Sequence, residues 1–156
     1  MPTTPDDLAE VMDHRVTVHT PAKGFRTGVA VRQHTLVADE PTEVGGTDEG
    51  PTPYDLLGAA LGACTAMTLR MYADRKKWPL TGITVHVEHD RIHADDCAYC
   101  ETEDDHIDRL SRVITLDGPL DDEQRSRLVE IADRCPVHRT LEGEIVIATA
   151  LAEADA

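Results

Sequence analysis

One long segment constrains the fold of this chain more than any other. It runs from Thr52 to Lys77 and reads TPYDLLGAALGACTAMTLRMYADRKK. Thr52 is a good N-cap, Pro53 suits the first helical position, and Pro79 lies just beyond the end. The apolar part is shorter than the roughly 20 residues of a membrane span and is flanked by charges. The segment therefore predicts a core helix, buried on most sides, whose small residues let a second helix approach closely.

Alternating apolar and polar residues predict the strands. They are expected at 14–19, at 25–37 as one or two strands, at 82–93, at 111–116 and, last in the chain, at 144–151. A second helix with an apolar stripe is expected at 121–134, and the Cys135–Pro136 pair interrupts it. This order predicts an α+β fold with a mainly antiparallel sheet. We expect a flexible tail at residues 1–12 and a single domain at 13–156.

Charge and composition exclude several functions. The 156 residues include 30 acidic and 15 basic side chains, giving a formal charge of −15. Nucleic acids and anionic membranes both require a cationic surface, so we expect neither as a partner. The glycine-rich loop at 39–53 also carries acids that would repel phosphate. No secretory signal is visible, so we expect a cytoplasmic protein, where thiols are normally kept reduced.

Two of the four cysteines lie in or beside the expected helices. Cys64 is in the middle of the long helix, where its apolar neighbours favour a buried, inert thiol over a reactive one. Cys135 lies in the sequence RCPVHRT, in which Arg134, His138 and Arg139 would stabilise a thiolate. A buried cysteine at a helix end explains Cys135 equally well. The spacing does not show whether the two thiols meet.

The other two cysteines form a CxxC motif in the acidic stretch at 95–108. Cys97 and Cys100 are preceded by His93 and followed by His106, which together supply the ligand types of a tetrahedral zinc site. The order of these ligands matches no common zinc finger. A solvated loop with a loose thiol pair is the alternative.

Four stretches of the sequence carry a resemblance to a known family. They are GPTPYDLLGAALGACTAMTLRMYADRK, ADRCPVHRTL, HTLVADEP and HVEHDRIHADDC. Together they resemble the OsmC/organic hydroperoxide resistance (Ohr) family over nearly the whole chain, and most closely its OsmC-like redox protein branch. The resemblance implies an OsmC-like fold, in which the sheets of an intertwined homodimer wrap around central helices. It also implies active sites at the subunit interface.

The resemblance further implies a chemistry for two cysteines. Cys64 would be the peroxidatic thiol, which attacks an organic hydroperoxide and becomes a sulfenic acid. Cys135 would be the resolving thiol, which condenses with that acid to a disulfide. A dithiol reductant, such as a dihydrolipoyl group, would reopen the disulfide. No metal or organic cofactor is needed.

The chain departs from the family pattern at one position. Family peroxidases carry a glutamate ten residues before the reactive cysteine, where it orients an activating arginine. Here the position holds Tyr54, followed by Asp55. The basic residues that could activate the thiol instead are Arg15, Lys23, Arg26, His138 and Arg139.

The sequence thus leads to one function with two alternatives. We expect a thiol-dependent peroxidase that uses Cys64 and Cys135. The first alternative is a redox or thiol-binding protein of the same fold with little peroxidase turnover. The second is a zinc-stabilised binding protein that uses the loop from His93 to His106.

Overall fold

The computed structural model describes residues 16–98, 100 and 104–152. The contacts within the chain group into two compact units. One comprises residues 1–53 and 145–156, and the other comprises residues 54–144. The tail expected at 1–12 lies outside the described residues, and a single domain at 13–156 stays a prediction.

The first unit contains a three-stranded antiparallel sheet. Its strands are β1 (Val16–His19), β2 (Thr27–Val31) and β3 (His34–Ala38), paired in chain order. Residues 25–37 therefore contribute two strands, within the range expected.

A buried carboxylate organises the loop that follows β3. Asp39 is only 2% exposed and accepts hydrogen bonds from the Thr47 hydroxyl at 2.6 Å and from the backbone N–H groups of Glu40 and Glu49. The Thr47 hydroxyl contributes most to holding the pKa of Asp39 below its usual value. The loop, which includes the short 3-10 helix η2 (Thr42–Val44), is thus ordered around one ionised side chain.

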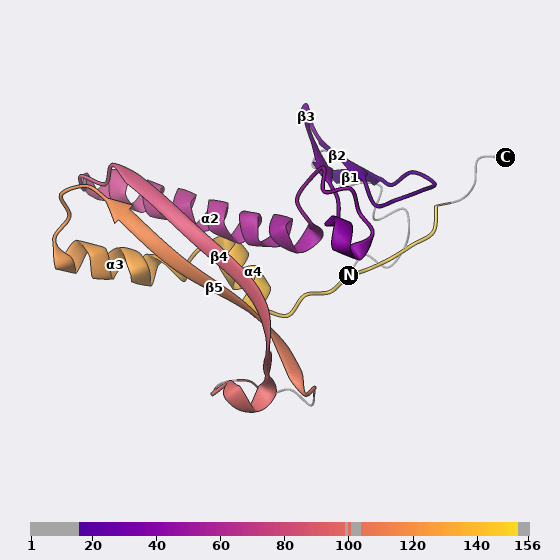
Figure 1. Cartoon of the computed structure of the whole chain (residues 1–156). Helices are drawn as coiled ribbons and strands as arrows, with labels where there is room; N and C mark the ends of the chain where they lie inside the picture. Colours follow the sequence, from indigo (N-terminus) through magenta and orange to yellow (C-terminus); the bar gives the residue numbers. More distant parts are fainter. Residues whose placement is uncertain (1–15, 99, 101–103, 153–156) are drawn as a thin grey trace. The chain divides into compact units, whose positions relative to one another are not determined.

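The second unit is built on a long two-stranded antiparallel ribbon, with three helices beside it (Figure 1). The ribbon consists of β4 (Gly82–His93) and β5 (His106–Asp117), joined by a connection that contains η3 (Ala94–Asp96). The helices are α2 (Pro53–Lys76), α3 (Asp122–Ala132) and α4 (Pro136–Glu142).

One face of the ribbon is covered by the helices. Side chains on this face alternate with exposed ones along both strands, and the register pairs them across the ribbon. They are Ile83, Val85, Val87, His89, Leu110, Arg112, Ile114 and Leu116. Helix α2 approaches closely because it presents glycine here: a Cβ on Gly62 would lie 3.3 Å from Val87.

The core of this unit lies between α2 and α3. Leu69 and Ala73 of α2 pack against Leu128, Ile131 and Ala132 of α3. Asp121 begins α3 with a reciprocal capping box to Gln124. The packing of a second helix on α2 is therefore as expected.

Within the single chain, however, α2 is not buried on most sides. Its buried residues form one stripe, while Met67 and Met71 are 66% and 72% exposed. By length and apolar composition alone, α2 is the one described helix that could cross a membrane, a criterion that core helices of soluble proteins also meet. The buried stripe of α2, which packs in the core, accounts for the apolar composition of this helix.

Two other expectations need correction. Residues 144–152 form no strand, because this apolar stretch pairs with no other strand of the described chain. Strand β5 begins at His106, so the acidic connection is shorter than the stretch 95–108. The interruption of the helix at Cys135–Pro136 is confirmed, and a separate helix, α4, begins there because Pro136 is well suited to the first turn of a helix.

We predict that Leu128→Ala lowers the free energy of unfolding by about 3 kcal/mol, because Leu128 is fully buried in the core between α2 and α3. Denaturant unfolding followed by circular dichroism measures this change. The matched control is Val129→Ala on the same helix, where the side chain is 56% exposed and the expected loss is below about 1 kcal/mol. Equal losses for the two variants would contradict the assigned core.

Candidate functional site

Two cysteines far apart in the sequence meet in the second unit. Cys64 comes from the middle of α2, and Cys135 is the N-cap residue of α4. Each of the two side chains shifts the pKa of the other, so the two thiols are neighbours. Cys64 is half-buried, whereas Cys135 is fully buried. The two residues that the family resemblance pairs are thus in contact.

The surroundings of the two thiols favour a negative charge on Cys135. Burial alone would raise its pKa, but the neighbouring Cys64 side chain and the backbone N–H groups of His138 and Val137 lower it below the ordinary value. The pKa of Cys64 is raised, first by burial and then by its interaction with Cys135.

Arg112 connects the elements that carry the two cysteines. Its Nη1 donates to Thr65 Oγ1 at 2.8 Å and to the carbonyl oxygen of Ala132 at 3.1 Å. Its Nη2 lies 3.0 Å from Asp133 Oδ1 and 2.7 Å from His138 Nδ1. The guanidinium thus links α2, the end of α3 and the start of α4, with a side chain only 12% exposed.

The two ring nitrogens of His138 have different partners. Nδ1 accepts from Arg112 Nη2, and Nε2 lies 2.9 Å from Glu142 Oε2. His138 therefore supports Arg112 as an acceptor and contributes its backbone N–H to Cys135.

Sequence reasoning missed Arg112. A signal was present: Leu110, Arg112, Ile114 and Leu116 alternate along β5, so an arginine occupies an otherwise apolar, inward face. A charged residue at such a position requires partners, and charged residues with buried partners are frequent at functional sites.

The structure brings only some of the predicted site residues together. Cys64, Cys135 and His138 form one cluster, whereas Arg139 is exposed on α4. Tyr54 lies ten residues before Cys64, roughly 15 Å away along the helix axis. Asp55, next to it, shares its pocket.

That pocket is separate from the cysteines. Tyr54 stacks on His89 with ring centroids 4.4 Å apart, and the two rings line a pocket of about 550 Å³ with Asp55. Of the other basic candidates, Lys23 and Arg26 belong to the first unit, where Arg26 pairs with Glu49 at 3.3 Å. Arg15 lies outside the described residues.

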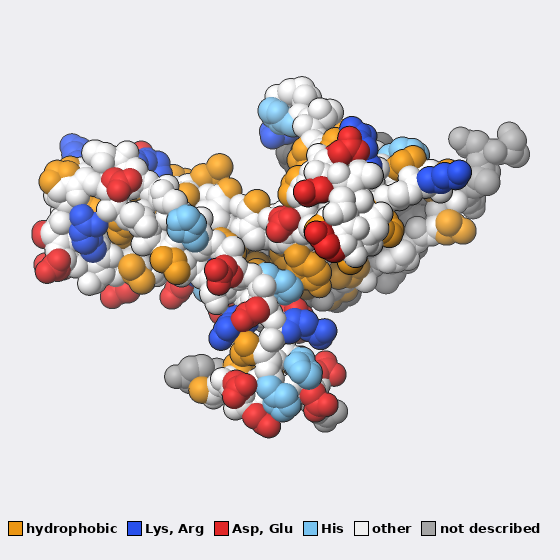
Figure 2. Space-filling model, in the orientation of Figure 1, with side chains coloured by type: hydrophobic (Ala, Val, Ile, Leu, Met, Phe, Trp, Pro, Cys, Tyr) orange, Lys and Arg blue, Asp and Glu red, His pale blue; other side chains and the backbone are white. Residues whose placement is uncertain are grey.

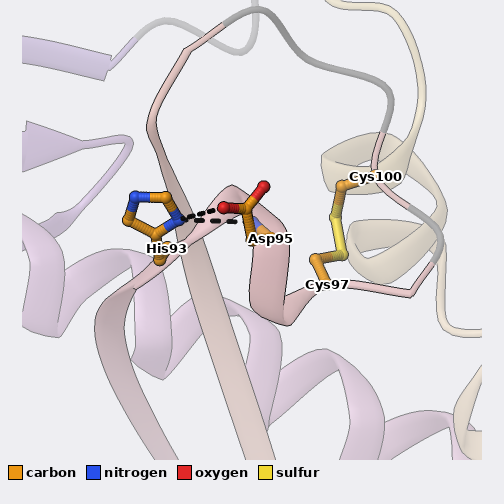
Figure 3. The surroundings of a disulfide bond; sticks show 4 residues. All are labelled: His93, Asp95, Cys97 and Cys100. Carbon is orange, nitrogen blue, oxygen red and sulfur yellow. Dashed lines mark hydrogen bonds and ion pairs between the residues drawn. A yellow bond between two sulfur atoms is a disulfide. The ribbon is translucent and has the colours of Figure 1, made fainter.

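The CxxC motif forms a disulfide between Cys97 and Cys100, with Cα atoms 5.5 Å apart (Figure 3). The His93 ring turns toward Asp95, with Nδ1 at 3.4 Å from the carboxylate. Within the described part of the chain, no group of three or more His, Cys, Asp or Glu side chains could hold a metal ion. The loop thus holds Cys97 and Cys100 as a disulfide.

Comparison with known proteins identifies the family. The OsmC-like protein family model matches residues 46–150, which include both α2 and the Cys135 region. The chain belongs to the OsmC-like protein family. No curated protein matches it in sequence.

Solved structures share the fold. An OsmC-like protein from Mycoplasma pneumoniae superposes with a TM-score of 0.66 at 19% identity, covering 83% of this chain and 87% of the other. The organic hydroperoxide resistance protein OsmC from Legionella pneumophila superposes with a TM-score of 0.59 at 21% identity, covering 83% of this chain and 90% of the other. The organic hydroperoxide resistance protein OhrB of Bacillus subtilis superposes with a TM-score of 0.58 at 17% identity, covering 85% of this chain and 93% of the other. These likenesses show that this chain has the OsmC-like α+β fold.

We predict that Arg112→Gln shifts the pH profile of thiol alkylation upward by about one unit. Without the guanidinium, Thr65 and His138 are no longer held in place, and the hydrogen-bond donors around Cys135 move away from its sulfur. The measurement is the rate of alkylation against pH, with the Cys97–Cys100 disulfide intact. Arg109→Gln is the matched control, since Arg109 lies on the same strand and pairs with Asp90 at 2.9 Å. An unchanged profile for Arg112→Gln would contradict the role of this arginine.

Proposed function

We propose that this OsmC-like protein is a thiol-dependent peroxidase that reduces organic hydroperoxides with Cys64 and Cys135. The observation that carries the proposal is that Cys64 of α2 and Cys135 at the start of α4, 71 residues apart in the sequence, are neighbours that shift each other's pKa. Relatives of the same fold are named organic hydroperoxide resistance proteins, which supports the substrate class. The cytoplasm, where thiols are kept reduced, suits such a cycle.

Accessibility assigns the two roles. Cys64 is half-buried and Cys135 is fully buried, so a hydroperoxide can reach the sulfur of Cys64 first. Apolar side chains of α2 continue the face of Cys64: Met67 and Met71 lie three and seven residues further on. Their exposed surfaces suit the alkyl group of an organic hydroperoxide.

The first step is the attack of Cys64 on the hydroperoxide. The Cys64 thiolate attacks the terminal peroxide oxygen, and the O–O bond breaks. Cys64 becomes a sulfenic acid, and the alkoxide leaves as the alcohol after taking a proton from water. The Cys135 thiol then condenses with the sulfenic acid, which forms the disulfide and releases water. Arg112 and His138 are positioning residues in this scheme.

An external dithiol completes the cycle. Its thiolate attacks the Cys64–Cys135 disulfide, and its second thiol displaces the mixed disulfide, so that both protein thiols are restored. A dihydrolipoyl group has the required pair of thiols. Neither a metal nor an organic cofactor takes part in these steps.

The proposal predicts that one equivalent of organic hydroperoxide removes two thiols per reduced chain, which a colorimetric thiol assay measures. Cys135→Ser should leave a sulfenic acid on Cys64 that a dimedone-type probe traps, because no resolving thiol is present. Cys64→Ser should consume no hydroperoxide. Ala66→Ser on α2 serves as the control and keeps full consumption. Undiminished consumption by Cys64→Ser would disprove the assignment.

We also propose that the active form is an intertwined homodimer with the sites at its interface. The stretch 145–151 is apolar and has no strand partner in the described chain: Ile147 and Leu151 are 85% and 94% exposed. An exposed apolar segment with strand-like residues can add to a sheet edge of a second copy. The exposed methionines beside Cys64 would be covered in the same assembly.

Truncation after Gly143 should therefore convert a dimer into a monomer, as measured by light scattering coupled to gel filtration. The reason is the loss of the exposed apolar segment. Deleting only residues 153–156 is the matched control, which should leave the dimer intact. A truncated chain that is as dimeric as the full chain would contradict this role of the segment.

A further inference from the structure

Two histidines lie opposite each other at the tip of the β4–β5 ribbon. His93 ends β4, His106 begins β5, and the register pairs them directly. The backbone N–H of Ala94 donates to the carbonyl oxygen of Asp105 at 2.9 Å, so the two histidines form a non-hydrogen-bonded pair of the ladder. Side chains approach most closely in such pairs, and the two imidazole centroids are 5.4 Å apart.

This separation suits two imidazoles that share one metal ion. Imidazole nitrogens bind Zn²⁺ at about 2.0 Å, which places the centroids of two rings on the same ion roughly 5 Å apart. Both side chains are exposed, so each ring can turn one nitrogen toward a common ion. Imidazole favours Zn²⁺, Ni²⁺ and Cu²⁺, whereas Mg²⁺ and Ca²⁺ prefer oxygen ligands.

Asp95 holds the ring of His93 in the way that a ligating histidine requires. Nδ1 of His93 lies 3.4 Å from both the carboxylate and the backbone nitrogen of Asp95, and the other ring nitrogen points away from Asp95 (Figure 3). When a metal ion binds Nε2, the ring proton is on Nδ1, where the carboxylate can accept it. Asp95 therefore leaves Nε2 of His93 as the nitrogen for the ion.

The surface around the two histidines is acidic. Figure 2 shows histidine and acidic side chains gathered at this end of the ribbon, and the exposed acids there include Asp95, Asp96 and Asp105. A nearby cation of β4, Arg91, is paired with Asp108 at 3.7 Å. The local field therefore attracts a cation from solution.

We propose that His93 and His106 form a binding site for one divalent transition-metal ion, with Zn²⁺ as the type. Water completes the coordination shell, because the described residues offer no group of three His, Cys, Asp or Glu side chains for one ion. The Cys97–Cys100 disulfide keeps the neighbouring sulfurs out of the ligand set. The site is independent of the proposed peroxidase chemistry, and a bound ion ties the two strands together at the end of the ribbon.

Isothermal titration calorimetry with Zn²⁺ tests this site. The protein is the full chain with its two free thiols replaced (C64S/C135S) and its disulfide intact, so that no thiol competes for the metal. One ion should bind per chain, and Mg²⁺ should not displace it. His93→Gln and His106→Gln should each weaken binding by at least about tenfold, since even an outer partner of a ligating histidine contributes that much.

The matched control is His86→Gln in the same background. His86 is exposed on the same strand but lies opposite Val113 rather than a histidine, so its loss should leave the affinity unchanged. Unchanged affinity in both His93→Gln and His106→Gln would overturn the site. An equal loss of affinity in His86→Gln would overturn it as well.

A second measurement needs no substitution. In the wild-type chain, paramagnetic Ni²⁺ added below one equivalent should broaden the NMR signals of the His93 and His106 rings before those of His86. This order is expected because only the paired rings hold the ion. Equal broadening of the three rings would mean non-specific binding and would contradict the proposal.

Discussion

The geometry of the cysteine pair depends on one arginine held among three helices. Arg112 donates hydrogen bonds to Thr65 on α2 and to the end of α3, and its Nη2 lies 2.7 Å from His138 on α4. An arginine cannot lose its charge, so a largely buried guanidinium must keep its partners in place. The same contacts that satisfy this charge therefore set the position of α4, whose N-cap is Cys135, against the helix that carries Cys64.

A thiol pair held in this way combines two properties that a single buried cysteine lacks. One sulfur, that of Cys64, is reachable, while the other is surrounded by donors that stabilise its thiolate. In the proposed cycle the accessible sulfur, that of Cys64, is the nucleophile, although burial raises the pKa of its thiol.

The sequence was informative wherever the relevant interaction is local. The N-cap and proline at residues 52–53 placed α2 correctly, and alternation placed β4. The Cys64–Cys135 contact is long-range, so only the family resemblance anticipated it. Arg112 was missed because its importance depends on partners from three other elements. The strand expected at 144–151 failed for the same reason: a strand exists only with a neighbour to pair with.

The most direct test of the account is a crystal structure of the protein after treatment with one equivalent of organic hydroperoxide, using the variant C97S/C100S. The account predicts a covalent bond between the sulfurs of Cys64 and Cys135, with Arg112 still bound to Thr65 and His138. A structure in which Cys64 is oxidised to a sulfenic acid while Cys135 remains a free thiol at a distance would contradict it.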